Sequence, residues 1–508
     1  MLAKVKSTGL FGIRGYSIDI EVDISNGLPS FEIVGLADMA VKESRERVRS
    51  AIKNSGFEFP VRRITVNMAP GDTRKEGSAY DLPIAVGILK ATGQIPDNGF
   101  DPVYLGELSL DGSIRPVSGV LPMLLSASDS ESSAVLPVAN APEASHVKGM
   151  AIYPFETLGE LVAALNGKAP LKEFKQIEDN EFHVDTDPAE DFLDVKGQEN
   201  AKRALKIAAA GGHNIIMIGS PGTGKTMLAR RLPSILPDLT YSEALEITKI
   251  YSAAGALNPA LGLIKQRPFR APHHTISSIA LVGGGRIPMP GEISLAHHGV
   301  LFLDELPEYK RDVLEVLRQP LEDGQITVSR ANGTAVFPAK FMLVGSMNPC
   351  PCGYFGDPGH ECSCTPGQIS RYMSKLSGPL LDRFDIHMEV SPIPFEKLTG
   401  DSRGESSQEM KQDVDRARNI QLERYKSEGI FCNSQLSSKQ LPKYCKLNDT
   451  QLLMLKEAFK MLSLSARAYD RILKVARTIA DLDGEERILD HHLAEAIQYR
   501  SLDRELWS

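Results

Sequence analysis

A glycine-rich stretch at residues 219–226, GSPGTGKT, constrains the fold more than any other feature of this chain. It follows the apolar run 214–218 and precedes a helical pattern at 227–230, which is the strand–loop–helix context of a phosphate-binding loop. Glycines let backbone N–H groups turn toward phosphate oxygens, and the helix N-terminus adds positive potential. Lys225 supplies a charge for the β- and γ-phosphates, and Thr226 offers a hydroxyl to Mg²⁺. The residues expected to bind ATP are Gly219, Ser220, Pro221, Gly222, Thr223, Gly224, Lys225 and Thr226.

A second motif supplies the acidic groups that ATP hydrolysis requires. The apolar run 299–303, typical of a buried strand, ends in Asp304 and Glu305. Asp304 is suited to hold Mg²⁺ together with Thr226, and Glu305 is suited to orient and deprotonate an attacking water. A core strand capped by two solvated acids is the structural alternative. The phosphate-binding loop upstream favours a hydrolytic site.

Composition and charge limit the class of protein. The 508 residues suffice for about three domains, each with its own core. No apolar run reaches the length of a membrane span, and the N-terminus lacks the apolar core of a signal peptide. We therefore expect a cytoplasmic protein with no membrane partner. The net charge of −8 argues against a uniformly basic surface, so any contact with DNA must be local.

Two weakly apolar, charged segments divide the chain. Residues 171–191 are acidic, and residues 391–410 are rich in proline, serine, glycine and charge, so both are interpreted as linkers. Strand and helix patterns are mixed in segment 1–170, alternate in segment 192–390 and become helical in segment 411–508. The sequence therefore predicts a multidomain α/β protein: an α+β N-terminal domain, a P-loop core with a parallel sheet, and a helical C-terminal domain.

Longer strings around these motifs resemble those of the AAA+ ATPases, in particular the magnesium-chelatase-like group and, within it, the ComM/YifB family. The resemblance covers nearly the whole chain. Besides the phosphate-binding loop, the strings that carry it are residues 194–198 (DVKGQ), 267–274 (RPFRAPHH), 291–299 (GEISLAHHG), 347–353 (MNPCPCG) and 378–385 (GPLLDRFD). The resemblance implies an AAA+ core with helices on both faces of the sheet and a C-terminal helical lid.

The resemblance also implies roles for three residues outside the phosphate-binding loop. Asn348, after the strand pattern 341–345, corresponds to the polar sensor between the acids and the attacking water. Arg383 corresponds to an arginine finger given to a neighbouring subunit, and Arg467 to the lid arginine of the nucleotide's own subunit. A planar guanidinium suits both tasks, and a surface ion pair is the alternative for either arginine. The protein is then expected to form a homo-oligomeric ring, with a hexamer as the expected state.

Two groups of basic residues are candidates for DNA contact. Residues 275–289 resemble the helix-2 insert of this AAA+ branch, which points toward the ring pore, and Arg286 at its glycine-rich tip is the cation. A solvated loop is the equal alternative. The second group lies in the N-terminal segment, partly on a helix predicted over 41–54, and a solvated face is the alternative for each member. This basic cluster comprises Lys42, Arg45, Arg47, Arg49, Arg62, Arg63, Arg74 and Lys75.

Part of the N-terminal segment resembles the Lon protease catalytic domain, namely residues 105–121 and 77–79. Lon-type proteolysis needs a serine nucleophile and a lysine whose lowered pKa lets it act as base. Ser78 lies near the nucleophile position, but Leu121 stands where the lysine would be and cannot accept a proton. We therefore expect a Lon-like (ribosomal S5 domain 2-like) fold without peptidase chemistry, which could serve as an assembly or nucleic-acid-binding collar.

Four of the six cysteines form two close pairs, Cys350 with Cys352 and Cys362 with Cys364. In a cytosolic protein such thiolates favour tetrahedral Zn²⁺ over disulfides. The single residue within each pair is a tighter spacing than the usual two. Free thiols and redox use therefore remain alternatives, and His360 is a substitute ligand.

Together these features predict a Mg²⁺- and ATP-dependent ring motor that acts on single-stranded or branched DNA. The resemblance implies a helicase that promotes branch migration during integration of transforming DNA. The alternative is a chelatase-type ATPase that remodels a protein partner or drives metal insertion, which would need a companion subunit with an integrin-like metal-binding domain. An ATP-dependent protease is a third interpretation, opposed by Leu121.

Overall fold

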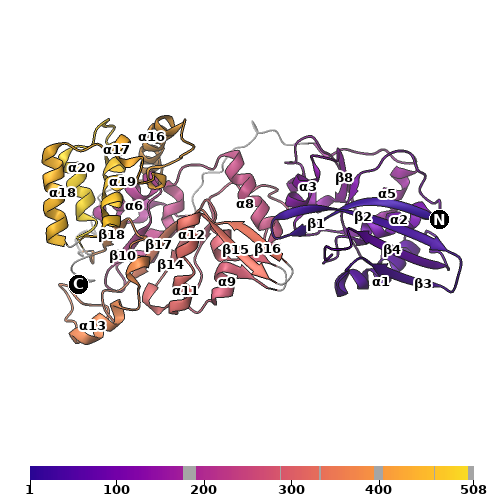
Figure 1. The fold of residues 1–508 in the computed structure, drawn as a ribbon, viewed down its shortest axis with the longest axis horizontal. Helices are drawn as coiled ribbons and strands as arrows, with labels where there is room; N and C mark the ends of the chain where they lie inside the picture. Colours follow the sequence, from indigo (N-terminus) through magenta and orange to yellow (C-terminus); the bar gives the residue numbers. More distant parts are fainter. Residues whose placement is uncertain (176–189, 286–287, 331–332, 394–403, 463, 502–508) are drawn as a thin grey trace.

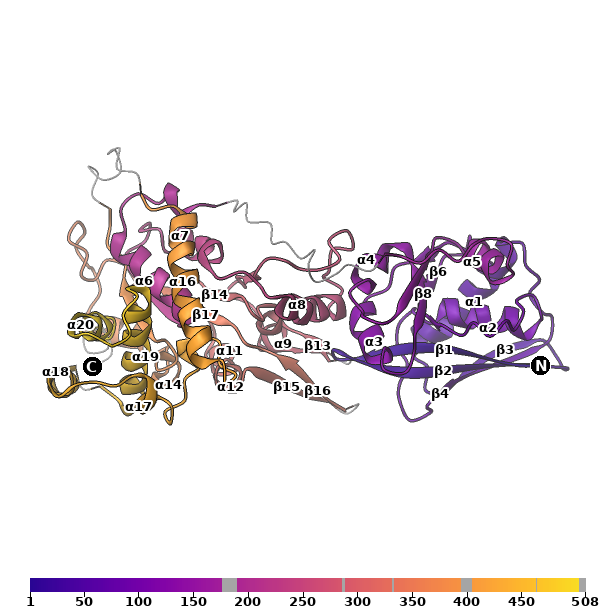
Figure 2. The ribbon, with the colours of Figure 1, turned by 90° about the horizontal axis from the view of Figure 1, so that it is seen from above.

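Three regions follow one another along an elongated molecule: an N-terminal α/β unit, a central parallel sheet with its helices, and a C-terminal helical region (Figures 1 and 2). The computed structural model describes residues 1–175, 190–285, 288–330, 333–393, 404–462 and 464–501. Within these ranges, no helix is both long enough and apolar enough to cross a membrane.

The N-terminal unit is a seven-stranded mixed sheet with helices packed against it. Strand alternation builds its core: in β2 (Arg14–Ser25), Ile18, Ile20 and Val22 are buried while the residues between them are more exposed. The sheet order is β3-β4-β2-β1-β5-β8-β9, and the pairs β1–β2 and β2–β4 are antiparallel. The other strands are β1 (Leu2–Phe11), β3 (Ser30–Val34), β4 (Arg63–Ala69), β5 (Val103–Tyr104), β8 (Ser133–Pro137) and β9 (Ala151–Phe155), beside the small pair β6 (Glu107–Leu108) and β7 (Ile114–Arg115). The helices are α1 (Met39–Asn54), α2 (Asp81–Ala91), α3 (Val120–Ala127), α4 (Ala141–Ala144) and α5 (Leu158–Leu165).

The central sheet has five parallel strands in the order β11-β14-β17-β10-β18. They are β10 (Ile215–Ile218), β11 (Phe269–Arg270), β14 (Val300–Leu303), β17 (Met342–Met347) and β18 (Ile386–Glu389). Every residue of β10, β14 and β17 is buried, and alternate residues enter different cores, Ile215 and Met217 one and Ile216 and Ile218 the other. Helices therefore cover both faces, as expected for a parallel sheet. The fold class predicted from sequence is confirmed.

Short helices and two hairpins surround this sheet. The helices are α6 (Glu199–Gly211), α7 (Lys225–Arg231), α8 (Tyr241–Ala253), α9 (Ser278–Val282), α10 (Glu292–Leu295), α11 (Arg311–Glu315), α12 (Arg318–Asp323), α13 (Pro366–Met373) and α14 (Gly378–Leu381). The hairpins are β12 (Gly283–Gly284) with β13 (Met289–Pro290), and β15 (Gln325–Arg330) with β16 (Gly333–Pro338).

The C-terminal helices share one core with the sheet. They are α16 (Ser407–Tyr425), α17 (Leu441–Tyr444), α18 (Asp449–Leu462), α19 (Ala466–Leu482) and α20 (Asp490–Gln498). Ile472 and Ala476 of α19 pack in the same cluster as Ile215 of β10, with Leu205 of α6 also in that cluster. The C-terminal helical region is thus joined to the sheet by continuous apolar packing.

The second predicted linker is wrong at its C-terminal end. Helix α16 begins at Ser407, inside the stretch 391–410 that the sequence analysis assigned to a linker. Ser406 and Glu409 form a capping box, and Met410 is fully buried. The polar Ser406 and the charged Glu409 therefore start a helix at this point instead of continuing the linker. Positions 176–189 and 394–403 of the predicted linkers lie outside the described residues.

Among the described residues, the N-terminal unit contacts the central region through helix α3 and through the turn after β1. Helix α3 packs against α8, where the Gly119 amide donates to the Ser252 carbonyl (3.0 Å) and the Ser252 hydroxyl donates to buried Glu143 (2.7 Å). The turn after β1 packs against the β15–β16 hairpin, with Phe11 and Ile13 joining the core that contains Phe337. The two units therefore meet through both polar and apolar contacts.

The residues of the expected Lon-like site are embedded in the N-terminal unit. Leu121 is fully buried in α3, and the Ser78 hydroxyl donates to Glu107. An apolar side chain therefore packs in the core at the position where the resemblance would place the lysine. The likeness to Lon itself stays a prediction.

The structure removes two members from the predicted basic cluster. Arg47 on α1 donates through Nε (2.6 Å) and through a terminal nitrogen (3.0 Å) to Asp81, whose side chain is fully buried. Lys75 is buried, and its ammonium donates to the Pro70 carbonyl. Arg47 reaches Asp81 because α1 packs against α2, whereas Lys75 donates to a carbonyl of its own loop. Arg45 and Arg49 remain exposed on α1.

Replacing Arg47 with alanine is expected to destabilise the N-terminal unit by about 3 kcal/mol, since a buried carboxylate loses its charged partner. Arg45→Ala is the matched control because Arg45 is exposed on the same helix. Denaturant unfolding of the full chain, with amide hydrogen exchange of α1 and α2, measures the loss. Equal protection in the two variants would show that the Arg47–Asp81 pair contributes nothing to stability.

Candidate nucleotide site

The phosphate-binding loop joins β10 to α7 in a tight turn. Gly222 (φ +78°) and Gly224 (φ +89°) adopt left-handed backbone conformations that favour glycine. A Cβ atom on Gly219 would lie 2.3 Å from the carbonyl oxygen of Val390, the residue after β18, so the backbone there closes one side of the loop. The Thr223 hydroxyl donates to the Ser220 carbonyl (2.9 Å) within the loop. The shape of the loop therefore requires glycine at positions 219, 222 and 224.

Lys225 lies inside the loop, where three oxygen atoms accept hydrogen bonds from its ammonium group. Its Nζ donates to the carbonyls of Gly219 (2.7 Å) and Ser220 (3.0 Å) and to Oδ1 of Asn348 (3.2 Å). Burial lowers the pKa of Lys225, and the nearby carboxylates of Asp304 and Glu305 oppose that shift. Phosphate oxygens can take the place of these carbonyls without a large movement of the side chain. Lys225 and Asn348, 123 positions apart in the sequence, thus meet in this loop.

The oxygen atoms expected to serve Mg²⁺ lie together. The Thr226 hydroxyl donates to Oδ2 of Asp304 (2.7 Å), and the Ser346 hydroxyl donates to Oδ1 of the same carboxylate. The Glu305 amide also donates to Oδ1 of Asp304 (3.1 Å). A hydroxyl and a carboxylate side by side are the hard oxygen ligands that Mg²⁺ takes, so the donor set fits this ion.

Glu305 is held in an unusual backbone conformation and projects toward solvent. Its φ is +53°, and its side chain is 57% exposed. One carboxylate oxygen lies 3.8 Å from Nδ1 of His274, which stacks on His273 with ring centroids 4.1 Å apart. The Tyr309 hydroxyl donates to the Pro272 carbonyl (2.5 Å) and so ties the two segments together. Glu305 is therefore oriented away from the core and open to a water molecule.

The sequence analysis did not single out Ser346 or His274 as functional residues. Ser346 lies two positions before Asn348 on β17, and its signal was present as the one hydroxyl in an otherwise apolar strand. His274 belongs to the string 267–274, which carried only the family resemblance. Both residues contact the acids that the sequence did identify.

The two expected phosphate-binding arginines pair with carboxylates of their own subunit. Arg383, whose side chain is 14% exposed, forms an ion pair with Glu322 of α12. Arg467 lies at the start of α19 and approaches Asp382 at 3.5 Å, with a side chain that is 57% exposed. Burial lowers the pKa of Arg383, and the nearby cations Arg471 and Arg467 act in the same direction.

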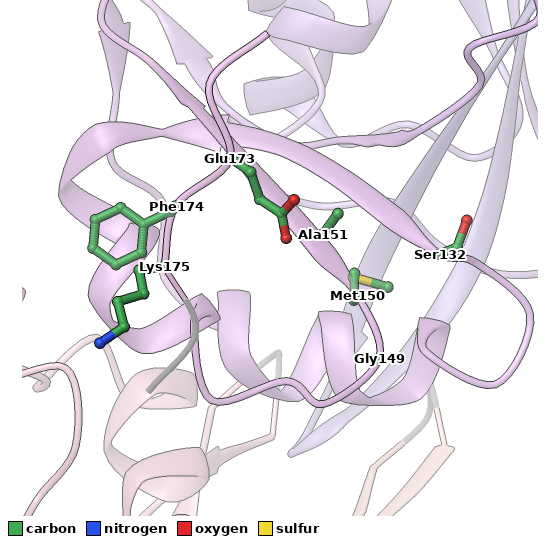
Figure 3. Close-up of a pocket in the computed structure, with 7 residues that line it drawn as sticks. All are labelled: Ser132, Gly149, Met150, Ala151, Glu173, Phe174 and Lys175. Carbon is green, nitrogen blue, oxygen red and sulfur yellow. The ribbon is translucent and has the colours of Figure 1, made fainter. Parts of the chain in front are cut away.

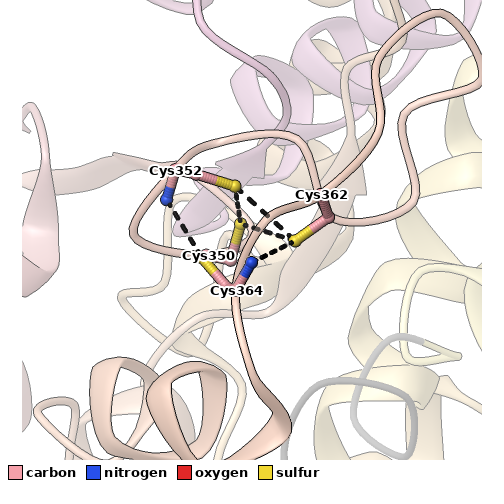
Figure 4. A group of neighbouring side chains, drawn as sticks. All are labelled: Cys350, Cys352, Cys362 and Cys364. Atoms are coloured by element: carbon pink, nitrogen blue, oxygen red, sulfur yellow. Dashed lines mark hydrogen bonds between the residues drawn. The ribbon is translucent and has the colours of Figure 1, made fainter.

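The side chains of Cys350, Cys352, Cys362 and Cys364 converge on one point (Figure 4). The Sγ atoms of Cys350, Cys352 and Cys362 lie 3.3–3.7 Å apart, and all four sulfurs lie within 4.8 Å of one another. A tetrahedron of sulfurs about 2.3 Å from Zn²⁺ has edges of about 3.8 Å, so this cluster fits zinc. His360 does not belong to the cluster: its ring stacks on Tyr354 and its Nδ1 lies 3.6 Å from Oδ1 of Asp357.

A second group of candidate metal ligands, Glu246, His297 and His298, is satisfied by hydrogen bonds. Nδ1 of His297 accepts from the Lys340 amide (3.0 Å), so its Nε2 carries the proton that faces Glu246 at 3.0 Å. A protonated nitrogen cannot bind a metal. This cluster fastens α8 to the segment before β14.

A groove in the N-terminal unit is lined by Ser132 and by residues 149–151 and 173–175 (Figure 3). It is wide open and shares no residue with the nucleotide site. It therefore adds nothing to the chemistry of the phosphate-binding loop.

Comparisons with known proteins agree with this geometry. Residues 191–398 match the family described as magnesium chelatase, subunit ChlI, residues 20–140 match subunit ChlI of Mg-chelatase, and residues 404–500 match its C-terminal family. Competence protein ComM of Haemophilus influenzae is 48% identical over 508 residues, which cover 99% of this chain and 98% of that protein. The chain belongs to the magnesium-chelatase family.

Two further relatives extend the comparison. Uncharacterized protein YifB of Salmonella typhimurium is 45% identical over 506 residues, or 99% of this chain and 98% of that protein. Magnesium-chelatase 67 kDa subunit of Chlorobaculum parvum is 29% identical over 164 residues, or 31% of this chain and 23% of that protein. The resemblance predicted from the sequence strings is confirmed. Membership of this AAA+ family implies ATP, Mg²⁺ and ATPase activity.

Lys225→Ala is expected to weaken ATP binding by at least about tenfold, because a charge-assisted contact worth roughly 1.5–3 kcal/mol is lost. Glu305→Gln is expected to keep ATP binding and abolish turnover, since only the base for the attacking water changes. Calorimetric titration with an ATP analogue and steady-state phosphate release measure the two effects.

Arg230→Ala is the control, because Arg230 is exposed on the same helix as Lys225. It should bind and hydrolyse ATP as the unmodified chain does. Normal turnover by Glu305→Gln would exclude Glu305 as the residue that activates water.

Proposed function

We propose that this chain is a Mg²⁺- and ATP-dependent AAA+ ring motor that acts on single-stranded or branched DNA. The specific activity proposed is a helicase that promotes branch migration in natural transformation and recombination. The observation that carries the ATPase part is the meeting of Thr226 with Asp304 and of Lys225 with Asn348 at one edge of the sheet. The full-length similarity to competence protein ComM supports the DNA part.

In the proposed reaction, Lys225 binds the β- and γ-phosphates while Thr226 and Asp304 hold Mg²⁺. The ion neutralises charge on the phosphate oxygens when it is bound. Glu305 accepts a proton from the attacking water, and Asn348 orients that water or the γ-phosphate. Ser346 fixes the Asp304 carboxylate through its hydroxyl and leaves the second oxygen toward Thr226.

Arg383 is proposed to act in the nucleotide site of a neighbouring subunit of a ring, with a hexamer as the expected state. In the single chain its guanidinium pairs with Glu322. Assembly would exchange this carboxylate for a phosphate oxygen, which binds the same planar fork. Arg467 is proposed to contact the nucleotide from the lid of its own subunit, and its exposure leaves it able to move from Asp382.

DNA contact is proposed for the exposed part of the N-terminal basic cluster and for the pore insert. Lys42, Arg45 and Arg49 lie exposed on α1, whereas Arg47 and Lys75 are withdrawn by their internal partners. Arg286 of the insert lies outside the described residues. Because the net charge is −8, such contacts must be local and sensitive to salt.

A second candidate function is a chelatase-type ATPase that remodels a protein partner or drives metal insertion. The matches to ChlI families over three segments of the chain favour it. So does the similarity to the magnesium-chelatase 67 kDa subunit, although that match covers only 31% of the chain. The two functions share the nucleotide site and differ in what the ring acts on.

A zinc ion is proposed on Cys350, Cys352, Cys362 and Cys364. The sulfur separations support it, as does the absence of any disulfide among the cysteines of the described residues. Thiolates are the ligands that structural zinc prefers. The ion would close a loop between Asn348 and Arg383, both residues of the proposed reaction.

Arg383→Ala is expected to lose ATPase activity alone and to regain part of it when mixed with Lys225→Ala. One variant lacks only the donated cation and the other only the receiving site, so mixed interfaces contain one complete site. Phosphate release is measured across mixing ratios in assemblies shown to hold both variants. No recovery at any ratio contradicts a shared site.

The DNA function is tested by ATP-dependent unwinding of a forked or three-stranded DNA substrate by the purified protein. Unwinding and DNA-stimulated ATPase are expected, with affinity that falls steeply as salt rises. Arg45→Ala with Arg49→Ala should weaken DNA binding while basal ATPase persists. Arg63 is an exposed residue of the same cluster on β4, and the DNA affinity of Arg63→Ala is compared with that of the double variant.

Absence of both unwinding and DNA stimulation, together with ATP-dependent binding of a protein partner, would favour the chelatase-type function. Loss of basal ATPase in the Arg45→Ala/Arg49→Ala variant would instead show that α1 supports the fold.

A further inference from the structure

The four-cysteine loop lies directly against the phosphate-binding loop. Asp357, midway between the two cysteine pairs, accepts a hydrogen bond through Oδ2 from the Ser220 hydroxyl (2.5 Å). Gly353 of the same loop faces Pro221 so closely that a Cβ at Gly353 would lie 2.6 Å from the proline ring. A segment with no ATP-binding motif of its own thus contacts two consecutive residues of the ATP-binding motif.

Asp357 is fixed by several partners. Its side chain is only 2% exposed, and Oδ1 accepts from the Gly359 amide (2.8 Å) and faces His360 at 3.6 Å. The hydrogen bond from Ser220 is the main cause that lowers the pKa of Asp357, followed by the bond from Gly359. The carboxylate is therefore ionised at neutral pH and accepts a charge-assisted hydrogen bond from Ser220.

The same loop is linked to the catalytic edge through the chain. Cys350 is fully buried and follows Asn348 by two positions, and Asn348 accepts from Lys225. The Gly219 amide donates to the Met347 carbonyl (3.2 Å), so the end of β17 also holds the start of the phosphate-binding loop. Both ends of the phosphate-binding loop therefore contact the segment that begins the cysteine insert.

The state of the cysteines determines how freely Asp357 can move. Residues 353–361 connect the two cysteine pairs, so a metal bound to all four sulfurs closes this stretch into a short ring. Closing a loop removes conformations that its middle residues would otherwise sample. The hydrogen bond to Ser220 is present with the four cysteines free, and a closed loop would hold Asp357 opposite Ser220 more firmly than free thiols would.

We propose that Asp357 is a positioning residue for the phosphate-binding loop, and that zinc on the four cysteines and ATP bind with positive coupling through the Asp357–Ser220 hydrogen bond. This inference rests on the zinc site proposed above. In this proposal Asp357 contacts neither ATP nor the zinc ion and acts only through Ser220. Linkage requires the effect to be reciprocal: zinc raises the affinity for ATP by the factor by which ATP raises the affinity for zinc.

The test measures this reciprocity on the full chain. The affinity for a slowly hydrolysed ATP analogue is measured with Mg²⁺, with and without bound Zn²⁺. Zn²⁺ affinity is then measured with a chelating indicator, with and without the analogue. We expect each ligand to tighten the other on the order of tenfold. In Asp357→Ala, neither ligand should change the affinity for the other. Elemental analysis of this variant should still find about one zinc per chain.

Three comparison variants separate coupling from loss of fold. Glu361→Ala removes an exposed carboxylate from the same loop and should keep the coupling, which excludes a general charge effect. Ser220→Ala should lose the coupling as Asp357→Ala does, and the double variant should lose no more than either single one. Asp357→Asn, which retains an acceptor oxygen, should recover part of it.

Each failure has a distinct meaning. Zinc content near zero contradicts the zinc site, and a nucleotide affinity that Asp357→Ala leaves unchanged then overturns the positioning role as well. Zinc bound at one per chain with no reciprocal effect overturns the coupling alone. Equal loss in Glu361→Ala and Asp357→Ala overturns the assignment to the Asp357–Ser220 bond.

Discussion

The parallel pairing of β10, β14 and β17 is the constraint on which the nucleotide site depends. In this register Ile218 lies beside Met347, and Leu303 lies beside Gly345. The three strands therefore end within one or two residues of each other, so the phosphate-binding loop after β10, Asp304 after β14 and Asn348 after β17 reach the same edge. Because every residue in these strands is buried, side chains can reach a ligand only beyond the strand ends, at that edge.

The same geometry explains which contacts of the site could be predicted from the sequence. The contact of Thr226 with Asp304 was predictable because each residue follows a recognisable strand or loop, although 78 positions separate them. The Asp357–Ser220 bond joins two irregular segments 137 positions apart, and no periodicity reports such a contact. Arg47 shows a further limit: the pattern of α1 shows that a cation is present but cannot show that Asp81 of another helix receives it.

Composition misled the prediction at one boundary. Residues 404–410 are as charged and polar as the linker before them, yet Ser406 and Glu409 satisfy the first amides of α16. Local hydrogen bonding decides where a helix starts, while average composition describes only whether a segment can form a core. The roles proposed for Arg383 and Arg467 would depend on a neighbouring subunit or on bound nucleotide, which no pattern within one chain contains.

The packing of the β1–β2 turn on the β15–β16 hairpin has a mechanical consequence. Phe11 contacts the strand start at Gly333, and a Cβ on Gly12 would lie 3.0 Å from the Ala335 side chain. β1 and β2 run from this contact through ten paired positions into the middle of the N-terminal sheet. Because these two strands are hydrogen-bonded into a seven-stranded sheet, a tilt of the hairpin at this contact turns the N-terminal sheet as one body.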